Sequence, residues 1–204
     1  MQLIGMPDSP YVRRVAISLK LLGLPFEHRP ISVFRAFDAF SAINPVVKAP
    51  TFVCDDGEVL MDSILILQYA EAIAVSGRSL VPSGRAAMQH ELRLIGLALA
   101  ACEKSVQIVY ERNLRPPEKQ HEPWVERVRG QLAAAYRGLE GELRTRPLTA
   151  TSASISQADV SVAVAWQFTQ ALLPGIVGES EHAALVAHTL AAEALPEFRA
   201  CPPP

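Results

Sequence analysis

Apolar positions in the first eighty residues alternate between strand-like runs and helix-like stripes, and turn-forming residues separate them. The short apolar runs predict four strands, over Gln2–Gly5, Phe26–Val33, Thr51–Cys54 and Glu58–Met61. Apolar residues at helical spacing predict helices over 10–22 and 63–73, with a short helical connection over 35–44. The order β-α-β-α-β-β-α indicates a compact α/β domain.

Two glycines predict where these elements end. Gly23 directly follows the last apolar residue of the first helix, which is the usual position of a glycine that stops a helix. Gly57 ends the run Asp55-Asp56-Gly57, and a hairpin turn needs the positive φ that glycine adopts readily. The third and fourth strands are therefore predicted to form a β-hairpin.

The rest of the chain has helical spacing, and no strand is predicted there. The spacing predicts helices over 86–113, 122–144, 156–172 and 181–194. A short polar stretch that contains Pro82 precedes them and predicts a linker. We expect an α/β domain over 1–77, a linker over 78–84 and an all-α helical bundle over 85–204.

Composition and charge narrow the classes of function. The chain has 204 residues, of which 50% are hydrophobic, and its formal net charge is −2. A nearly neutral chain without runs of Lys and Arg is not expected to bind nucleic acid. No uncharged apolar stretch is long enough to span a membrane, and the N-terminus lacks the pattern of a signal peptide.

The three cysteines are far apart and odd in number, which is typical of free thiols in a reducing compartment. We therefore expect a cytoplasmic protein. No Cys-x-x-Cys motif occurs, so dithiol redox chemistry is not expected. No metal site is expected either, because His182 and His188 are six residues apart and do not share one helix face.

Three short motifs lie where predicted helices or strands begin. Ser9 precedes Pro10 at the start of the first helix, and this order predicts Ser9 as the N-cap residue. Asp62-Ser63 places short polar residues, which are typical N-cap residues, at the start of the next long helix. Ala49-Pro50 opens the third strand, where a proline is tolerated at an edge.

Together, the order and spacing of Ser9–Val15, Asn44–Pro50 and Asp62-Ser63 resemble those of cytosolic glutathione S-transferases, of the bacterial type with Ser-Pro at the first helix. Ser156–Asp159 is similar to the capping motif of the family's C-terminal domain. The resemblance covers the whole chain. It implies a thioredoxin-like N-terminal domain, an all-helical C-terminal domain, glutathione as co-substrate and a homodimer.

The resemblance implies that Ser9 stabilises the glutathione sulfur as a thiolate. A free thiol has a pKa of about 8.5, and the partial positive charge of a helix N-terminus favours its ionised form. Tyr11 is the rival donor, and otherwise a wall of the second-substrate pocket, for which Tyr110 is a further candidate. A small hydrophobic electrophile is the expected second substrate.

The same resemblance implies the other glutathione contacts. Ala49-Pro50 would be a cis peptide that presents the N–H and C=O of Ala49 to the cysteinyl part of the ligand, as an added strand would. Lys48 could meet the glycyl carboxylate. Ser63 would hold the γ-glutamyl carboxylate at a helix N-terminus, and Asp62 would accept the γ-glutamyl ammonium group.

Two function hypotheses follow. The first is a glutathione S-transferase, with conjugation, peroxide reduction and isomerisation all open as its reaction. The alternative is a non-catalytic binding or scaffold protein with the same fold, like the stringent-starvation-type members. Two departures from the family pattern favour that alternative: Asp62 stands where Glu or Gln is usual, and Val46-Val47 replaces a region that often holds glycine.

Overall fold

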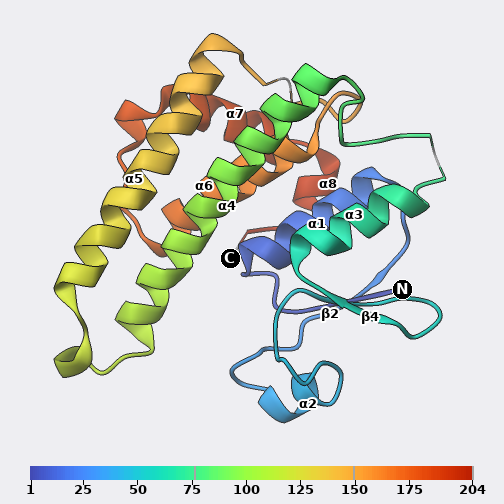
Figure 1. The fold of residues 1–204 in the computed structure, drawn as a ribbon, viewed down its shortest axis with the longest axis horizontal. Coiled ribbons are helices and arrows are strands. Elements are labelled where there is room, and N and C mark those ends of the chain that lie inside the picture. The colour runs from blue at the N-terminus through green and yellow to red at the C-terminus, as the bar shows by residue number, and fades with distance from the viewer. Residues whose placement is uncertain (76, 149, 204) are drawn as a thin grey trace. The chain divides into compact units, whose positions relative to one another are not determined.

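The computed structural model describes residues 1–75, 77–148 and 150–203. The chain divides into two compact units, which are described separately. The first unit contains Met1–Leu80 together with Pro196–Pro204, and the second contains Val81–Leu195. Figure 1 shows strands only in the first unit, whereas the second is built from long helices.

A four-stranded mixed sheet forms the centre of the first unit, in the order β2-β1-β3-β4. Its strands are β1 (Gln2–Ile4), β2 (Glu27–Arg29), β3 (Thr51–Val53) and β4 (Val59–Met61). β1 is parallel to β2 and antiparallel to β3, and β3 forms an antiparallel hairpin with β4. The sheet and its helices have the predicted β-α-β-α-β-β-α order and form a thioredoxin-like domain.

Three helices follow strands of this sheet: α1 (Pro10–Leu21) after β1, α2 (Phe37–Ser41) after β2 and α3 (Ser63–Ile73) after β4. Figure 1 shows α1 and α3 side by side, with α2 apart from them. Their apolar faces and the strands form a closed core, in which the following side chains are fully buried: Leu3, Ile4, Val12, Val15, Ile17, Phe52 and Ile66.

The predicted ends of these elements are confirmed at both glycines. Gly23 has a φ of 69° just after α1, and the following N–H of Leu24 donates to Leu19 O. Gly57 has a φ of 90° in the β3–β4 turn. The second strand is shorter than the predicted 26–33, because Pro30 follows β2 directly and has no N–H to donate to a neighbouring strand.

The C-terminal segment is part of the first unit and packs on α1. α8 (Pro196–Arg199) contacts α1, and Arg13 Nε donates to Cys201 O at 2.8 Å. The Arg13 guanidinium also lies 5.7 Å from the centre of the fully buried Phe198 ring. This grouping differs from the expected helical domain over 85–204 in its last nine residues, and the limits of independently folding domains stay a prediction.

Four long helices build the second unit: α4 (Arg85–Asn113), α5 (Glu122–Thr145), α6 (Gln157–Leu172) and α7 (Ala183–Glu193). α6 is buried on nearly all sides and packs with α4 and α7. Two 3-10 turns, η1 (Pro117–Lys119) and η2 (Glu179–Glu181), interrupt the connections. α7 begins two residues later than predicted because η2 forms a separate turn before it.

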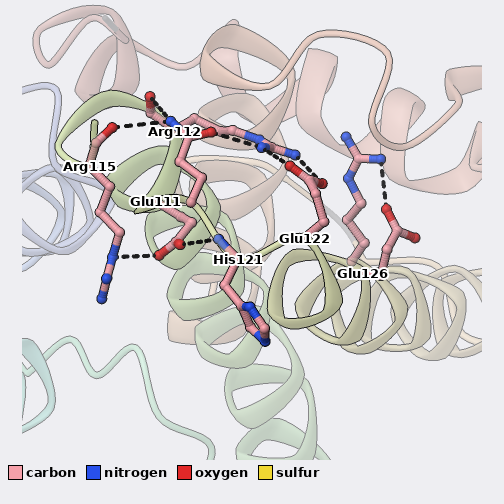
Figure 2. Close-up of polar contacts among 8 residues, drawn as sticks. Glu111, Arg112, Arg115, His121, Glu122 and Glu126 are labelled. Carbon is pink, nitrogen blue, oxygen red and sulfur yellow. Dashed lines mark hydrogen bonds and ion pairs between the residues drawn. The ribbon is translucent and has the colours of Figure 1, made fainter. Parts of the chain in front are cut away.

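Charged side chains close the turn between α4 and α5, as Figure 2 shows. Glu122 accepts from both terminal nitrogens of Arg112, and this hydrogen bonding lowers the pKa of Glu122. Glu111 pairs with Arg115 at 2.9 Å and also accepts from the backbone N–H of His121, the N-cap residue of α5. The buried Glu111 thus fixes the start of α5, whereas the exposed Arg112 pair adds little stability.

Two buried carboxyl groups meet at the start of α6. Ser156 and Asp159 exchange both bonds of a capping box, which confirms the predicted capping pair. Glu91 on α4 accepts from the backbone N–H of Ala158. Burial raises the pKa of Glu91 against the hydrogen bonds from Ala158 and Ser156, and Asp159 raises it further.

No helix in the described ranges is both long and apolar enough to cross a membrane. Within the same ranges, no group of three His, Cys, Asp or Glu side chains is placed to hold a metal ion.

The raised pKa of Glu91 predicts a pH-dependent stability. Because this pKa is higher in the folded chain than in the unfolded one, the stabilising contribution is complete below the unfolded pKa and is lost as pH rises through the folded pKa. Glu91→Gln cannot ionise and keeps an acceptor for Ala158, so its free energy of unfolding should fall less steeply as pH rises. Urea unfolding between about pH 4 and pH 8 measures this, followed by the fluorescence of Trp124 and Trp166.

Glu103→Gln is the matched control, because Glu103 is an exposed carboxylate on the same helix. It should keep the wild-type pH dependence. If Glu91→Gln kept it as well, the buried carboxyl would not be its source.

Candidate functional site

The topology of the sheet places the starts of α1 and α3 at one edge. β1 and β4 each pair antiparallel with β3, and they therefore run in the same direction. α1 follows β1 and α3 follows β4, so both helices begin at the edge where these strands end. The first N–H groups of a helix have no partners within it, so this edge gathers hydrogen-bond donors and partial positive charge.

Ser9 is the N-cap residue of α1, as predicted. Its Oγ accepts from the backbone N–H of Val12 at 3.4 Å, and Pro10 occupies the first helical position. The side chain is only half-buried. A hydroxyl that accepts one hydrogen bond keeps its own proton, so Ser9 can cap the helix and donate to a ligand at the same time.

Gly5 lets α1 and the loop before β3 approach β1 closely. It has a φ of 140°, and a Cβ placed on it would lie 2.6 Å from Val12 Cγ2 and 3.1 Å from Ala49 Cβ. Only glycine fits both this backbone conformation and this space. Gly5 thereby brings the start of α1 and Ala49 to the same end of β1.

The peptide bond between Ala49 and Pro50 is cis, as the resemblance implied. Lys48 O, just before it, accepts from Thr51 Oγ1 at 2.7 Å, and Thr51 Oγ1 accepts from Asn44 Nδ2 at 2.8 Å. Asn44 and Thr51 are buried, so these bonds hold the loop from inside. Ala49 itself is half-exposed, and its N–H and C=O bond to none of the other residues that the structure describes.

Asp62 and Ser63 form the start of α3. Asp62 is the N-cap residue, with a φ of 74° and its Oδ1 accepting from the backbone N–H of Ile64 at 3.0 Å. Ser63 is buried, and its Oγ accepts from Arg14 Nη1 at 3.0 Å. Because Ser63 Oγ only accepts in this bond, through one of its two lone pairs, its hydroxyl proton remains available to an acceptor such as a carboxylate.

Lys48 and Asp62 form an ion pair, with 3.0 Å between Lys48 Nζ and Asp62 Oδ2. Partial burial alone would raise the pKa of Asp62. The Ile64 N–H and the Lys48 and Arg14 charges outweigh it, so the pKa of Asp62 lies below its ordinary value. Asp62 is therefore a carboxylate at neutral pH.

The comparison of this chain with known proteins agrees with this geometry. A family model described as glutathione S-transferase, N-terminal domain, matches residues 3–77. A second model, glutathione S-transferase, C-terminal domain, matches residues 122–200, and the two together cover about three quarters of the chain. The chain belongs to the glutathione S-transferase family.

The chain is also similar to individual proteins over 63% to 100% of its length. It is 26% identical to the uncharacterized GST-like protein YibF of Escherichia coli K12, over 89% of each chain. It is 29% identical to a glutathione transferase family member of Pseudomonas fluorescens Pf-5 solved with bound glutathione, with a TM-score of 0.84 over 100% of this chain and 98% of that one. It is also 28% identical to a maleylacetoacetate isomerase of Pseudomonas aeruginosa, over 63% of this chain and 64% of the other.

Within this family member, the structure brings Lys48, Asp62 and Ser63 into one cluster. Ser9, the N-cap residue of α1, precedes Arg14 by five residues. This spacing corresponds to about 7.5 Å along the helix axis. Tyr11 belongs to the first unit, whereas Tyr110 is a half-exposed residue of α4 in the second. The roles proposed for these residues stay predictions.

Arg14 is the site residue that the sequence reasoning missed. It is buried on α1 and connects this helix to the start of α3 through Ser63. A signal was present in the sequence, since Arg13-Arg14 lies between Val12 and Val15 in a helix that is otherwise largely apolar, and α1 is in fact buried on nearly all sides. A charge within an apolar stretch needs a buried partner.

The close approach at Gly5 predicts a sensitive position. Gly5→Ala would place Cβ against Val12 and the Ala49 loop, so we expect a loss of about 1–3 kcal/mol in the free energy of unfolding, as for other overpacked sites. The control is Gly130→Ala on α5, where a Cβ meets nothing within 4 Å. That change should stabilise the helix by up to about 1 kcal/mol. Equal effects of the two changes in urea unfolding would refute the assignment.

Proposed function

We propose that this protein is a glutathione S-transferase whose first unit binds glutathione at the shared edge where α1 and α3 begin. The observation that carries the proposal is the pair of capped helix starts, at Ser9 and at Asp62-Ser63, joined by the buried hydrogen bond from Arg14. The full-length similarity to a Pseudomonas fluorescens protein solved with glutathione supports the choice of ligand.

The γ-glutamyl end of glutathione would lie at the start of α3. Its carboxylate would accept from the Ser63 hydroxyl and from the first N–H groups of the helix, beside the Arg14 charge. The Lys48–Asp62 pair stands at the same helix start. The cysteinyl backbone would pair with the N–H and C=O of Ala49 at the cis Ala49-Pro50 bond.

This placement directs the cysteine sulfur toward the start of α1. The N–H groups of the first turn and the Ser9 hydroxyl would stabilise the thiolate relative to the thiol, and the thiol proton would pass to solvent. The thiolate is the nucleophile: it forms a carbon–sulfur bond with a small hydrophobic electrophile, and a leaving group such as chloride departs with the bonding electrons. Tyr11, two residues after Ser9, is the alternative donor to the sulfur.

Tyr11 of the first unit and Tyr110 of the second are each, separately, a candidate for binding the second substrate. Peroxide reduction and isomerisation with bound glutathione use the same thiolate, so they are alternative outcomes of the same site. A binding protein without catalysis would retain the glutathione contacts and lack turnover.

We also propose that the protein acts in the cytoplasm as a homodimer with a role in detoxification. Apolar side chains are exposed on β4, at Val59 and Met61, and at the start of α3, at Ile64 and Leu65, and exposed apolar surface of this kind favours an interface with another chain. Light scattering after size-exclusion chromatography should give twice the 22.2 kDa mass of one chain. A monomer at micromolar concentration would contradict the dimer.

Ser9→Ala tests the mechanism. The wild type should bind glutathione resin and turn over a chlorinated aromatic electrophile. The variant should show a higher pKa of the bound thiol by thiolate absorbance, and a kcat/KM lower by roughly a hundredfold at neutral pH, as when one donor to an anion is lost. It should also lose about 1 kcal/mol of stability with its cap.

Ser156→Ala is the matched control, because it removes the cap of α6 in the other unit. It should lower stability by a similar amount and leave the pKa of the bound thiol unchanged. Unchanged turnover in Ser9→Ala would transfer the role to Tyr11 or to backbone N–H groups. Binding by the wild type without turnover of any electrophile in a broad panel would favour the non-catalytic alternative.

A further inference from the structure

The ion pair between Lys48 and Asp62 indicates which end of the thiol ligand these residues serve, an inference that rests on the proposed function. The family resemblance assigned Lys48 to the glycyl carboxylate and Asp62 to the γ-glutamyl ammonium group. These groups lie at opposite ends of glutathione. In the structure, however, Lys48 Nζ lies 3.0 Å from Asp62 Oδ2.

Both oxygens of the Asp62 carboxylate have partners. Oδ1 accepts from the Ile64 N–H at 3.0 Å, which orients the carboxylate on the helix, and Oδ2 accepts from Lys48. A ligand ammonium group bound to Asp62 would therefore stand next to the Lys48 ammonium group. Two like charges at such a distance repel each other, so the pair disfavours the assigned role of Asp62.

The backbone holds Lys48 beside α3. Its C=O accepts from Thr51 Oγ1 at 2.7 Å, and Thr51 is fully buried at the start of β3. Thr51 is also the strand partner of Met61, the residue just before Asp62. The register of the β3–β4 hairpin thus places the base of Lys48 and the start of α3 at the same end of the hairpin.

Positive charge exceeds negative charge at this helix start. Lys48 and Arg14 contribute two cations against the single carboxylate of Asp62, and the first turn of α3 adds partial positive charge. Ser63 adds a hydroxyl proton. This set of groups suits a carboxylate and not an ammonium group.

We infer that Lys48 and Asp62 act as one pair at the γ-glutamyl end, where they help Arg14 and Ser63 to recognise the ligand's α-carboxylate. In this inference, Lys48 does not bind the glycyl carboxylate at the other end of the ligand. The ligand class is therefore broader than glutathione: it comprises thiols that carry a γ-glutamyl carboxylate, with the glycyl carboxylate free to be modified.

Calorimetry with two ligands and four proteins tests this inference. The ligands are glutathione and its glycyl monoethyl ester, and the proteins are the wild type, Lys48→Met, Lys48→Arg and the control Lys20→Met. Lys20 is an exposed lysine near the end of α1. The wild type should bind the two ligands within about twofold of each other, a difference of less than about 0.5 kcal/mol.

Lys48→Met should weaken the binding of both ligands by the same factor, about threefold to tenfold, as expected of one half-exposed charge pair. Lys48→Arg should restore binding, since a guanidinium can pair with Asp62, and Lys20→Met should bind both ligands as the wild type does.

Two results would overturn the inference while the proposed function stands. One is a wild type that strongly prefers glutathione to its ester, with Lys48→Met removing that preference, because Lys48 would then read the glycyl carboxylate. The other is Lys48→Met binding both ligands as the wild type does. Failure of the wild type to bind glutathione at all would instead contradict the proposed function, and the inference with it.

Discussion

Two helices of the first unit begin at the same edge of the sheet, and the candidate site depends on this constraint. β1 and β4 run in the same direction because both pair antiparallel with β3, so α1 and α3 start together. Arg14, in the second turn of α1, then joins this helix to the first residue of α3 through Ser63 at 3.0 Å. Each helix start alone is an ordinary cap, whereas in the proposed function the two together would give glutathione one set of donors for its sulfur and another for its carboxylate.

This arrangement requires charge inside the protein. Arg14 is 2% exposed, and a guanidinium removed from water is costly unless its donors find acceptors. Ser63 supplies one acceptor, and the nearby Asp62 carboxylate supplies opposite charge. Asp62 is held ionised in return, with its pKa lowered in part by Arg14 and Lys48. Arg14 and Lys48 thus both favour the ionised form of Asp62, so these three charged residues form one electrostatic unit.

Most elements of this fold could be predicted from the sequence because their ends carry local signals. Pro10 after Ser9, the turn at Gly57 and the capping pair of Ser156 and Asp159 each act through neighbours in the chain. Interactions between distant segments carried no such signal. Phe198 packs near Arg13, 185 positions earlier in the chain, and Glu91 caps a helix that starts 66 residues later.

The same limit applies to the candidate site. The motifs located Ser9, Ala49-Pro50 and Asp62-Ser63, because each lies at the start of a helix or strand. The contacts among them depend on the strand register, which pairs Thr51 with Met61 and so brings Lys48 toward Asp62. A one-residue change of that register would turn alternate side chains to the opposite face, and the sequence pattern of such three-residue strands does not specify it strongly.

Carboxyl groups lie at helix starts in both units, but their pKa values are shifted in opposite directions. Asp62 at α3 is partly exposed, and its modest desolvation is outweighed by the Ile64 N–H and by the cations Lys48 and Arg14, so its pKa falls. Glu91 and Asp159 at α6 are almost fully buried, and burial raises the pKa of both against their hydrogen bonds. The favourable field of a helix N-terminus is present in both places, so burial and neighbouring cations decide the sign. At neutral pH the first unit thus keeps a charged cap beside its candidate site, whereas the carboxyl groups of the second unit serve the packing of α4 against α6.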